Sequence, residues 1–184
     1  MDIYNQLLKK YRNGPKAVGW GSKESQELRF KVLCDIDDLS GKTILDYGCG
    51  LGDLFSYLCN SAILMYVGYD RNEKMIAKAL KSYPYGVFRD YIEAEKYDYV
   101  FASGTFNLEE KEWTRKTYKE LDNMWQMCKK GVSVNFLSVF AEKKDKKCHY
   151  VNPTEMIKFA RKLTNWFTIR HDYKENDFTL YMYK

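Results

Sequence analysis

From residue 42 onward, short runs of apolar residues alternate with stretches in which apolar positions recur every three or four residues. The short runs suit buried strands, and the longer stretches suit amphipathic helices. The expected strands are residues 43–47, 63–69, 86–88, 97–102 and 132–139. The expected helices are residues 53–58, 73–82, 111–129, closed by Gly131, and 153–163. This alternation predicts a parallel sheet with helices on both faces.

The two ends of the chain follow other patterns. Residues 2–11 and 22–35 each place apolar side chains on one side of a helix, and Ser22 is positioned to cap the second helix. Residues 166–171 and 178–183 flank a polar turn and predict an antiparallel hairpin. Apolar and polar residues alternate in the last strand, which predicts one buried face and one wetter face.

The length and composition indicate one domain. A chain of 184 residues with 45% hydrophobic content can bury one sizeable core. Residues 1–184 are therefore expected to form a single domain. Within it, residues 1–40 hold the N-terminal helices and a lid, residues 41–184 form the ligand-binding core, and residues 140–152 are an insertion.

The cysteines and charges narrow the class of protein further. The five cysteines are scattered, without a CxxC pair or a histidine at metal-ligand spacing, so we expect reduced thiols in the cytoplasm and no metal site. No apolar run is long enough to span a membrane. The net charge of +5 is modest and does not by itself indicate a nucleic-acid partner. The lysines of residues 143–147 form either a docking contact for an anionic partner or a solvated loop.

The segment ILDYGCGLGD, residues 44–53, carries the most specific chemistry. A buried strand runs there into three alternating glycines, and a helix follows. Glycine removes the Cβ that would block a close ligand, and the helix N-terminus offers unpaired N–H groups. The segment predicts either a site for an anionic or zwitterionic ligand or a tight turn without one.

Carboxylates fall at the ends of the first three expected strands. Asp46 and Asp70 end the first and second strands, and Asp90 follows the third. Parallel strands end at the same edge of a sheet, where a carboxylate can accept hydrogen bonds from the hydroxyls of a ribose. Like charges gathered at one edge repel one another, so a nucleoside site is the stronger interpretation and separate helix caps the weaker one.

The segments ILDYGCGLGDL, YVGYDRNEKMIAKA, FRDY and YDYVFASGTFN, followed by the C-terminal hairpin, resemble the class I S-adenosylmethionine-dependent methyltransferases along residues 41–184. The resemblance implies an α/β fold with a Rossmann-like, seven-stranded, mostly parallel sheet in three α/β/α layers and a C-terminal antiparallel hairpin. The GxGxG spacing and the reversed last strand differ from dinucleotide-binding dehydrogenases, which leaves a dinucleotide oxidoreductase as a distant alternative.

The resemblance further implies S-adenosylmethionine as the cofactor. Asp46 would face the methionine amino group beside Gly48 and Gly50, and Asp70 would hold the ribose. The other implied cofactor residues are Arg71 beside the adenine, Asp90 at the adenine amino group, Tyr91 next to it, and Ser103 and Gly104 near the sulfonium.

The segment before the core is similar to the lid that such enzymes place over the cofactor. Trp20 would cover the cofactor, and Gln26 or Arg29 would meet the methionine carboxylate. The alternative is that Trp20 is an ordinary packing residue and that Gln26 and Arg29 are exposed polar side chains on a helix.

The segment SGTFN, which follows the fourth expected strand, argues against several acceptors. It lacks the Asn/Asp-Pro-Pro-aromatic motif of amino-methyltransferases, and Ser103 stands where metal-dependent catechol-type enzymes have an Asp. No Pro-Cys pair is present for attack on a cytosine ring.

We expect a small-molecule acceptor, such as a sugar, a nucleotide or a specialised metabolite. Phe106, Asn107 and Tyr150 would contact it, with His149 as candidate general base.

Two other functions fit the same residues. An RNA or protein methyltransferase would use the lysines of residues 143–147 for docking. A non-catalytic adenosylmethionine-binding subunit would need a partner chain. The expected oligomeric state is a monomer or a homodimer.

Overall fold

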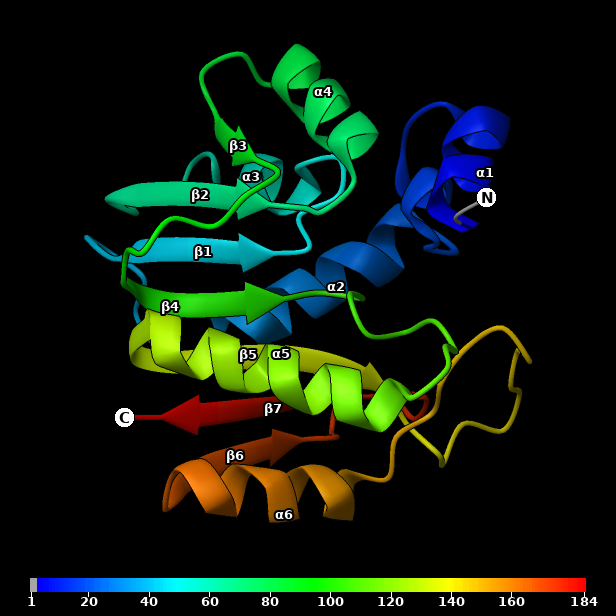
Figure 1. Cartoon of the computed structure of the whole chain (residues 1–184), viewed down its shortest axis with the longest axis vertical. Helices are drawn as coiled ribbons and strands as arrows, with labels where there is room; N and C mark the ends of the chain where they lie inside the picture. Colours follow the sequence, from blue (N-terminus) through cyan, green and yellow to red (C-terminus); the bar gives the residue numbers. More distant parts are fainter. Residues whose placement is uncertain (1–2) are drawn as a thin grey trace.

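The computed structural model describes residues 3–184, in which strands and helices alternate (Figure 1). The strands are β1 (Thr43–Tyr47), β2 (Met65–Tyr69), β3 (Val87–Arg89), β4 (Tyr97–Ala102), β5 (Cys128–Leu137), β6 (Trp166–Arg170) and β7 (Asp177–Tyr183). The helices are α1 (Ile3–Tyr11), the 3-10 helix η1 (Pro15–Val18), α2 (Lys23–Cys34), α3 (Asp53–Leu58), α4 (Glu73–Ser82), α5 (Trp113–Met127) and α6 (Pro153–Leu163).

These strands form a sheet in the order β3-β2-β1-β4-β5-β7-β6. Neighbours from β3 to β5 pair in parallel, whereas β7 runs antiparallel to β5 and to β6. The predicted mostly parallel sheet with an antiparallel C-terminal pair is therefore confirmed. The chain moves outward from β1 to β3 and then returns to the other side of β1, so the strand order reverses between β1 and β4. Ligands of open α/β sheets bind beyond the carboxyl ends of the strands at such a reversal.

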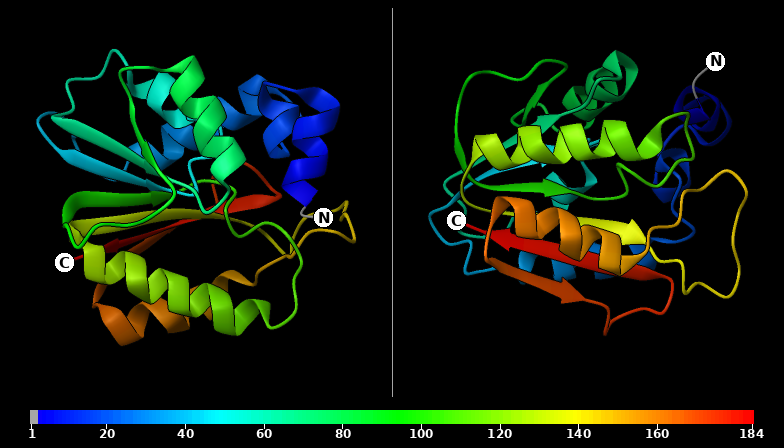
Figure 2. Two further views of the ribbon diagram at one scale, coloured as in Figure 1. Left: turned by 45° about the horizontal axis from the view of Figure 1, so that its top comes forward. Right: turned by 60° about the horizontal axis from the view of Figure 1, so that its bottom comes forward.

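Helices cover both faces of the sheet. α5 and α6 lie on one face, and α2, α3 and α4 lie on the other (Figure 2). Leu121 and Met124 of α5 are fully buried in the first layer, and Leu33 of α2 and Leu54 of α3 are buried in the second. Burying a side chain of this size stabilises the fold by about 1.5–3 kcal/mol. The two apolar layers hold the strand ends in place.

The helix caps agree with the predicted helix starts. The Ser22 hydroxyl accepts a hydrogen bond of 3.1 Å from the Ser25 amide at the start of α2. The Asn152 side chain accepts one of 3.0 Å from the Thr154 amide, with Pro153 at the first position of α6. Both caps satisfy amides that lack a partner within the helix.

The prediction that Gly131 closes a helix is wrong. α5 ends at Met127, and Gly131 lies inside β5, where it pairs with Tyr99 of β4 and Tyr183 of β7. A Cβ at Gly131 would lie 2.7 Å from the backbone oxygen of Met182. This glycine is therefore required for close packing of strands rather than for a helix end.

The predicted wetter face of the last strand is also wrong. Thr179 and Tyr181 are both buried, because β7 lies between β5 and β6 and beneath α2. The Tyr181 hydroxyl donates a hydrogen bond to the backbone oxygen of Val32, and the hydroxyls of Thr179 and Tyr173 lie 2.9 Å apart. The polar atoms of this face find protein partners instead of water.

Within residues 3–184, no helix is both long and apolar enough to cross a membrane. Even α5 has only 15 residues, whereas about 20 apolar residues are needed to span a bilayer.

Candidate functional site

The glycine turn after β1 brings bare backbone to the edge of the sheet. Gly48, Gly50 and Gly52 have positive φ angles of 84°, 54° and 80°, a conformation that other residues rarely adopt. A Cβ at Gly48 would also lie 2.5 Å from the Thr105 hydroxyl oxygen. The turn is therefore fixed both by backbone conformation and by contact with the segment after β4.

Asp70 joins the end of β2 to this turn. Its carboxylate accepts hydrogen bonds from the Gly50 amide at 2.9 Å and from the Asn72 amide at 2.8 Å. The amides of Gly48 and Cys49 donate to the backbone oxygen of Tyr69, at 2.7 Å and 2.9 Å. These bonds hold the Asp70 carboxylate in one orientation beside the glycines.

Asp46 is a buried carboxylate beneath the same turn. Its side chain is 2% exposed, and it accepts a hydrogen bond of 2.5 Å from the Tyr66 hydroxyl. Burial raises the pKa of Asp46 to about 7, against the lowering effect of Tyr66, and the negative charges of Asp70 and Asp53 raise it further. A cationic group placed beside Asp46 would favour its charged form.

Gln26 and Asp53 form a second polar pair in this region. The Gln26 amide donates a hydrogen bond of 2.9 Å to the Asp53 carboxylate. Burial raises the pKa of Asp53, and this hydrogen bond opposes the shift. The pair connects α2 to the first residue of α3.

The segment after β4 faces the glycine turn. The Gly104 amide donates to the Asn135 side chain at 2.8 Å, and the Thr105 hydroxyl donates to the Tyr47 backbone oxygen at 2.8 Å. A Cβ at Gly104 would lie 2.7 Å from the ring of Trp20. The indole of Trp20 therefore lies directly against the end of β4.

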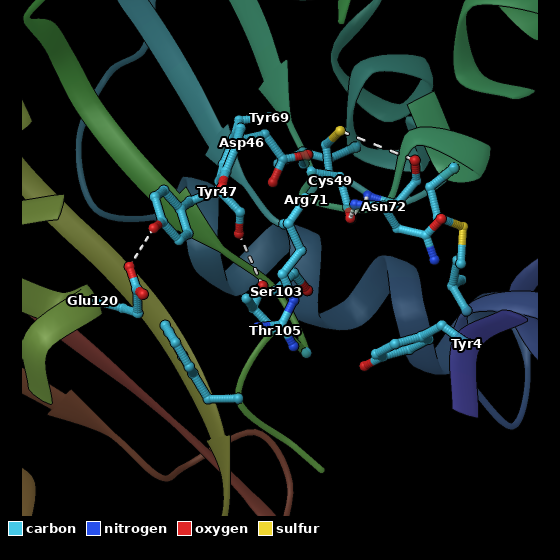
Figure 3. Close-up of a pocket in the computed structure, with 18 of the residues that line it drawn as sticks. Tyr4, Asp46, Tyr47, Cys49, Tyr69, Arg71, Asn72, Ser103, Thr105 and Glu120 are labelled. Carbon is cyan, nitrogen blue, oxygen red and sulfur yellow. Dashed lines mark hydrogen bonds between the residues drawn. The ribbon is translucent and has the colours of Figure 1, made fainter. Parts of the chain in front are cut away.

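These strand ends line one cavity of about 430 Å³ (Figure 3). Ten residues expected at the site line it: Trp20, Gln26, Asp46, Gly48, Gly50, Asp70, Arg71, Ser103, Gly104 and Phe106. Tyr4 of α1 also lines it, as do Tyr47 and Tyr69, whose rings lie 5.0 Å apart. Residues that follow or end β1, β2 and β4 therefore line one cavity.

One wall of the cavity comes from α5 and was missed in the sequence. Arg115, Lys116, Lys119 and Glu120 line the cavity, and Glu120 accepts a hydrogen bond from the Tyr47 hydroxyl. Burial is the main cause that raises the pKa of Tyr47, and the Glu120 carboxylate raises it further. The spacing of residues 116, 119 and 120, which share one side of a helix, was the sequence signal that could have indicated this wall.

Of the two residues expected at the methionine carboxylate, Gln26 lines the cavity and Arg29 lies outside its lining. Its side chain is 3% exposed and is paired through two nitrogens with the buried carboxylate of Asp177 in β7. The guanidinium carbon lies 4.7 Å from the centre of the Trp20 ring. Arg29 therefore supports Trp20 from behind and joins α2 to the sheet.

Asp90 and Tyr91 also lie outside this cavity. They line a separate depression between α4 and β3, which includes Leu80 and Val87. Tyr91 is 57% exposed, and its ring lies 5.9 Å from the Arg89 guanidinium. The ends of β1 and β2 therefore share the cavity, whereas the end of β3 borders a separate depression.

Three expected acceptor residues, Asn107, His149 and Tyr150, are likewise not part of the cavity lining. The His149 ring stacks on Trp113 with centroids 3.8 Å apart, and its Nδ1 lies 2.8 Å from a Glu109 carboxylate oxygen. The Tyr150 hydroxyl accepts a hydrogen bond from a loop amide at 2.8 Å. The Oδ1 atom of Asn107 is buried and has no hydrogen-bond partner within residues 3–184.

The insertion at residues 140–152 is attached to the segment that precedes α5. Leu108 and Cys148 form an antiparallel bridge. The Glu109 amide donates to the Lys147 backbone oxygen at 2.9 Å, and the His149 amide donates to the Asn107 backbone oxygen at 3.0 Å. The insertion therefore braces the segment that carries Phe106 and Glu110 into the cavity.

In the part of the chain that the structure describes, no group of three or more His, Cys, Asp or Glu side chains is placed to hold a metal ion. The five cysteines are all free thiols, and burial raises the pKa of Cys49 in the glycine turn.

The fold and the site were compared with known proteins. No family model matches the chain, and no curated protein matches it. Magnesium protoporphyrin IX methyltransferase from Synechocystis PCC 6803, solved with bound SAH, is 15% identical and superposes with a TM-score of 0.70 over 98% of this chain and 93% of its own. A TehB-like SAM-dependent methyltransferase from Corynebacterium glutamicum is 17% identical, with a TM-score of 0.69 over 98% of each chain.

A small RNA methyltransferase is also similar. It is 14% identical, with a TM-score of 0.62 over 86% of this chain and 25% of its own. The chain therefore has the fold of the class I S-adenosylmethionine-dependent methyltransferases, which confirms the predicted fold. Because these similar structures include a porphyrin methyltransferase and an RNA methyltransferase, the fold alone does not select an acceptor.

Proposed function

We propose that this protein is an S-adenosylmethionine-dependent methyltransferase that acts on a small-molecule acceptor. The observation that carries the proposal is the meeting of the β1 and β2 ends, with Asp46, Asp70 and the glycine turn, on one cavity where the strand order reverses. A strand-end carboxylate beside bare backbone suits a nucleoside with a charged tail.

The residues of the cavity fit S-adenosylmethionine. The volume of about 430 Å³ lies within the range of small-molecule sites. The buried carboxylate of Asp46, which is costly to ionise alone, suits the positively charged amino group of the methionine part. The carboxylate of Asp70, oriented by two backbone amides, suits the ribose hydroxyls, because each carboxylate oxygen can accept more than one hydrogen bond.

The remaining cavity residues would enclose the cofactor. Gly48 and Gly50 would lie along the methionine part, and Trp20 would cover it. The first carbons of the Arg71 side chain would flank the adenine, while its guanidinium extends across the cavity (Figure 3). Ser103 and Gly104 would close the site near the sulfonium. Asp90 and Tyr91 follow β3 at the same sheet edge, and we propose that they reach the adenine from outside the cavity described above.

Methyl transfer places few chemical demands on the protein. Bound S-adenosylmethionine supplies a methyl group that is already activated, so the protein must orient the acceptor in line with it and exclude water. Positioning of this kind can lower a barrier by about 7–11 kcal/mol. Trp20 and Phe106 supply apolar walls that exclude water, and Tyr47 with Glu120 offers a hydrogen-bonded pair at the α5 wall.

A small-molecule acceptor is supported by the aromatic lining of the cavity. Tyr4, Tyr69 and Phe106 come from three separate segments and give the cavity an aromatic lining of the kind that binds small ligands. RNA or protein acceptors are the second candidate, favoured by the exposed lysines of residues 143–147 on the loop that braces the cavity wall.

The proposal is tested in two steps. Isothermal titration calorimetry should show that the purified chain binds S-adenosylmethionine and its demethylated product, whereas NAD should give no heat. Labelled-methyl transfer to cell-extract fractions, sorted into small molecules, RNA and protein, should then place the label in the small-molecule fraction. Absence of binding to either adenosyl compound would refute the function, and binding without transfer to any fraction would favour a non-catalytic subunit.

A further inference from the structure

Charged side chains are divided between two walls of the cavity. Asp46, Asp53 and Asp70 belong to β1, to α3 and to the end of β2. The opposite wall, α5, contributes the cations Arg115, Lys116 and Lys119, together with Glu120. Arg71, at the end of β2, is a further cation in the lining.

Protein carboxylates neutralise only some of these cations. Arg115 pairs with Glu112 at 2.9 Å, and Lys116 pairs with Glu110 at 2.5 Å. Within residues 3–184, Arg71 and Lys119 form neither an ion pair nor a hydrogen bond. Among the described residues, the cavity therefore contains two exposed cations that no protein anion engages.

Arg71 extends across the cavity toward the segment that follows β4. Figure 3 shows its side chain extending across the cavity in the direction of Ser103 and Thr105. Its positive charge partly opposes the effect of burial, which is the main cause that raises the pKa of Tyr47 and of Tyr69. The guanidinium therefore lies close enough to Tyr47 and Tyr69 for its charge to act on both hydroxyls.

S-adenosylmethionine does not account for two unpaired cations on this side. Its carboxylate is its only anionic group, and its ammonium and sulfonium groups add positive charge. Two cations that face a sulfonium across a cavity repel it unless an anion lies between them. Arg71 and Lys119 are both exposed at the cavity, so their charges are available to the other reactant.

We propose that the methyl acceptor carries an anionic group, a carboxylate or a phosphate, which binds between Arg71 and Lys119. This inference rests on the proposed function and adds the substrate class to it. A guanidinium donates two parallel hydrogen bonds to either anion, and a lysine adds a mobile point charge. The same anion is attracted to the sulfonium, so its binding orients the acceptor toward the methyl group.

The first test measures anion binding to the protein saturated with the demethylated cofactor. Calorimetry would use pyrophosphate as the phosphate probe and citrate as the carboxylate probe, and we expect at least one of them to bind. Lys119→Ala and Arg71→Ala should each weaken that binding about tenfold, because each removes a charge-assisted hydrogen bond to the anion. Lys158→Ala, which removes an exposed lysine of α6 outside the cavity, is the matched control and should bind as the wild type does.

The outcomes separate the two proposals. If the wild type binds the demethylated cofactor but neither probe, or if both variants bind the probes as tightly as Lys158→Ala, the anionic acceptor is refuted while the cofactor site stands. If the variants lose the cofactor and not the probes, Arg71 and Lys119 serve the cofactor instead. If the wild type binds no adenosyl compound, both proposals fail.

A second test uses the labelled-methyl products. Small-molecule products would be passed over an anion-exchange resin at neutral pH, and we expect the label in the retained fraction. Phosphatase treatment that releases the label would identify a phosphate, and retention after treatment would identify a carboxylate. Label only in unretained molecules, in RNA or in protein would overturn the inference.

Discussion

The Tyr66 hydroxyl donates a hydrogen bond of 2.5 Å to the buried carboxylate of Asp46. This bond lowers the pKa of Asp46, but burial has the larger effect and raises the pKa to about 7. The folded protein therefore holds a proton on Asp46 at pH values where an unfolded chain, with an ordinary pKa of about 3.9, has released it. The link between proton binding and folding makes stability depend on pH.

Stability contributed by Asp46 should fall as the pH rises from about 4 to about 7. The folded state binds the proton more tightly in this window, so raising the pH favours unfolding by about 1.4 kcal/mol per pH unit for this group. Urea denaturation at pH 5 and pH 8 should show a loss for the wild type that Asp46→Asn does not share. Equal pH dependence of the two proteins would contradict the assignment.

Cofactor affinity should have the opposite pH dependence. The proposed contact with a positively charged amino group needs ionised Asp46, so binding of S-adenosylmethionine should strengthen as the pH rises through about 7. Tyr66→Phe removes the bond that lowers the pKa and should shift this rise to higher pH. Tyr85→Phe, which alters a 98% exposed tyrosine, is the control and should leave the calorimetric profile unchanged.

Asp70→Ala should weaken binding of S-adenosylmethionine by more than about tenfold, because charge-assisted hydrogen bonds to the ribose are lost. The amides of Gly50 and Asn72 lose their acceptor as well. Asp122→Ala, on the exposed side of α5, should bind normally in the same titration. Unchanged affinity of the Asp70 variant would remove this residue from the site.

Gly48→Val should abolish cofactor binding and reduce stability by more than about 1 kcal/mol. The positive φ disfavours any side chain, and the added Cβ meets the Thr105 hydroxyl. Gly21→Ala, where a Cβ meets open space, should be close to neutral in both thermal unfolding and titration. Normal binding by the Gly48 variant would mean that the glycines form only a turn.

Arg29→Met should cost about 3–5 kcal/mol of folding free energy, because it leaves the carboxylate of Asp177 buried without a partner. Replacing both residues, as Arg29→Met with Asp177→Leu, should recover much of the loss in urea denaturation. If the single variant binds S-adenosylmethionine about tenfold more weakly while its folding is intact, Arg29 has a direct role that its position outside the cavity does not suggest.

Local patterns predicted most of the elements correctly. The helix at 153–163 was defined by a capping Asn152 and by Pro153, and both act within a few residues of the helix start. The strand at 97–102 and the helix at 73–82 likewise depend on short-range periodicity. Such signals are local in the chain, so one sequence is enough to find them.

The sequence did not reveal the contacts between distant segments. The pairing of Arg29 is one of them, because its partner Asp177 lies 148 positions away. Thr179 and Tyr181 looked half-exposed, but β7 is inserted between two other strands. Likewise, the α5 wall became part of the cavity only through the packing of α5 near Tyr47 and Tyr69. Periodicity does not encode these pairings.

The bridge between Leu108 and Cys148 connects the loop of residues 140–152 to one wall of the cavity. The loop of residues 140–152 is connected to the wall that carries Phe106 and Glu110, and it does not line the cavity itself. Exchanging this loop for one of another length would move that wall while leaving the glycine turn and Asp70 in place. The loop is therefore a point where engineering can reshape the cavity wall without changing the residues proposed to hold the cofactor.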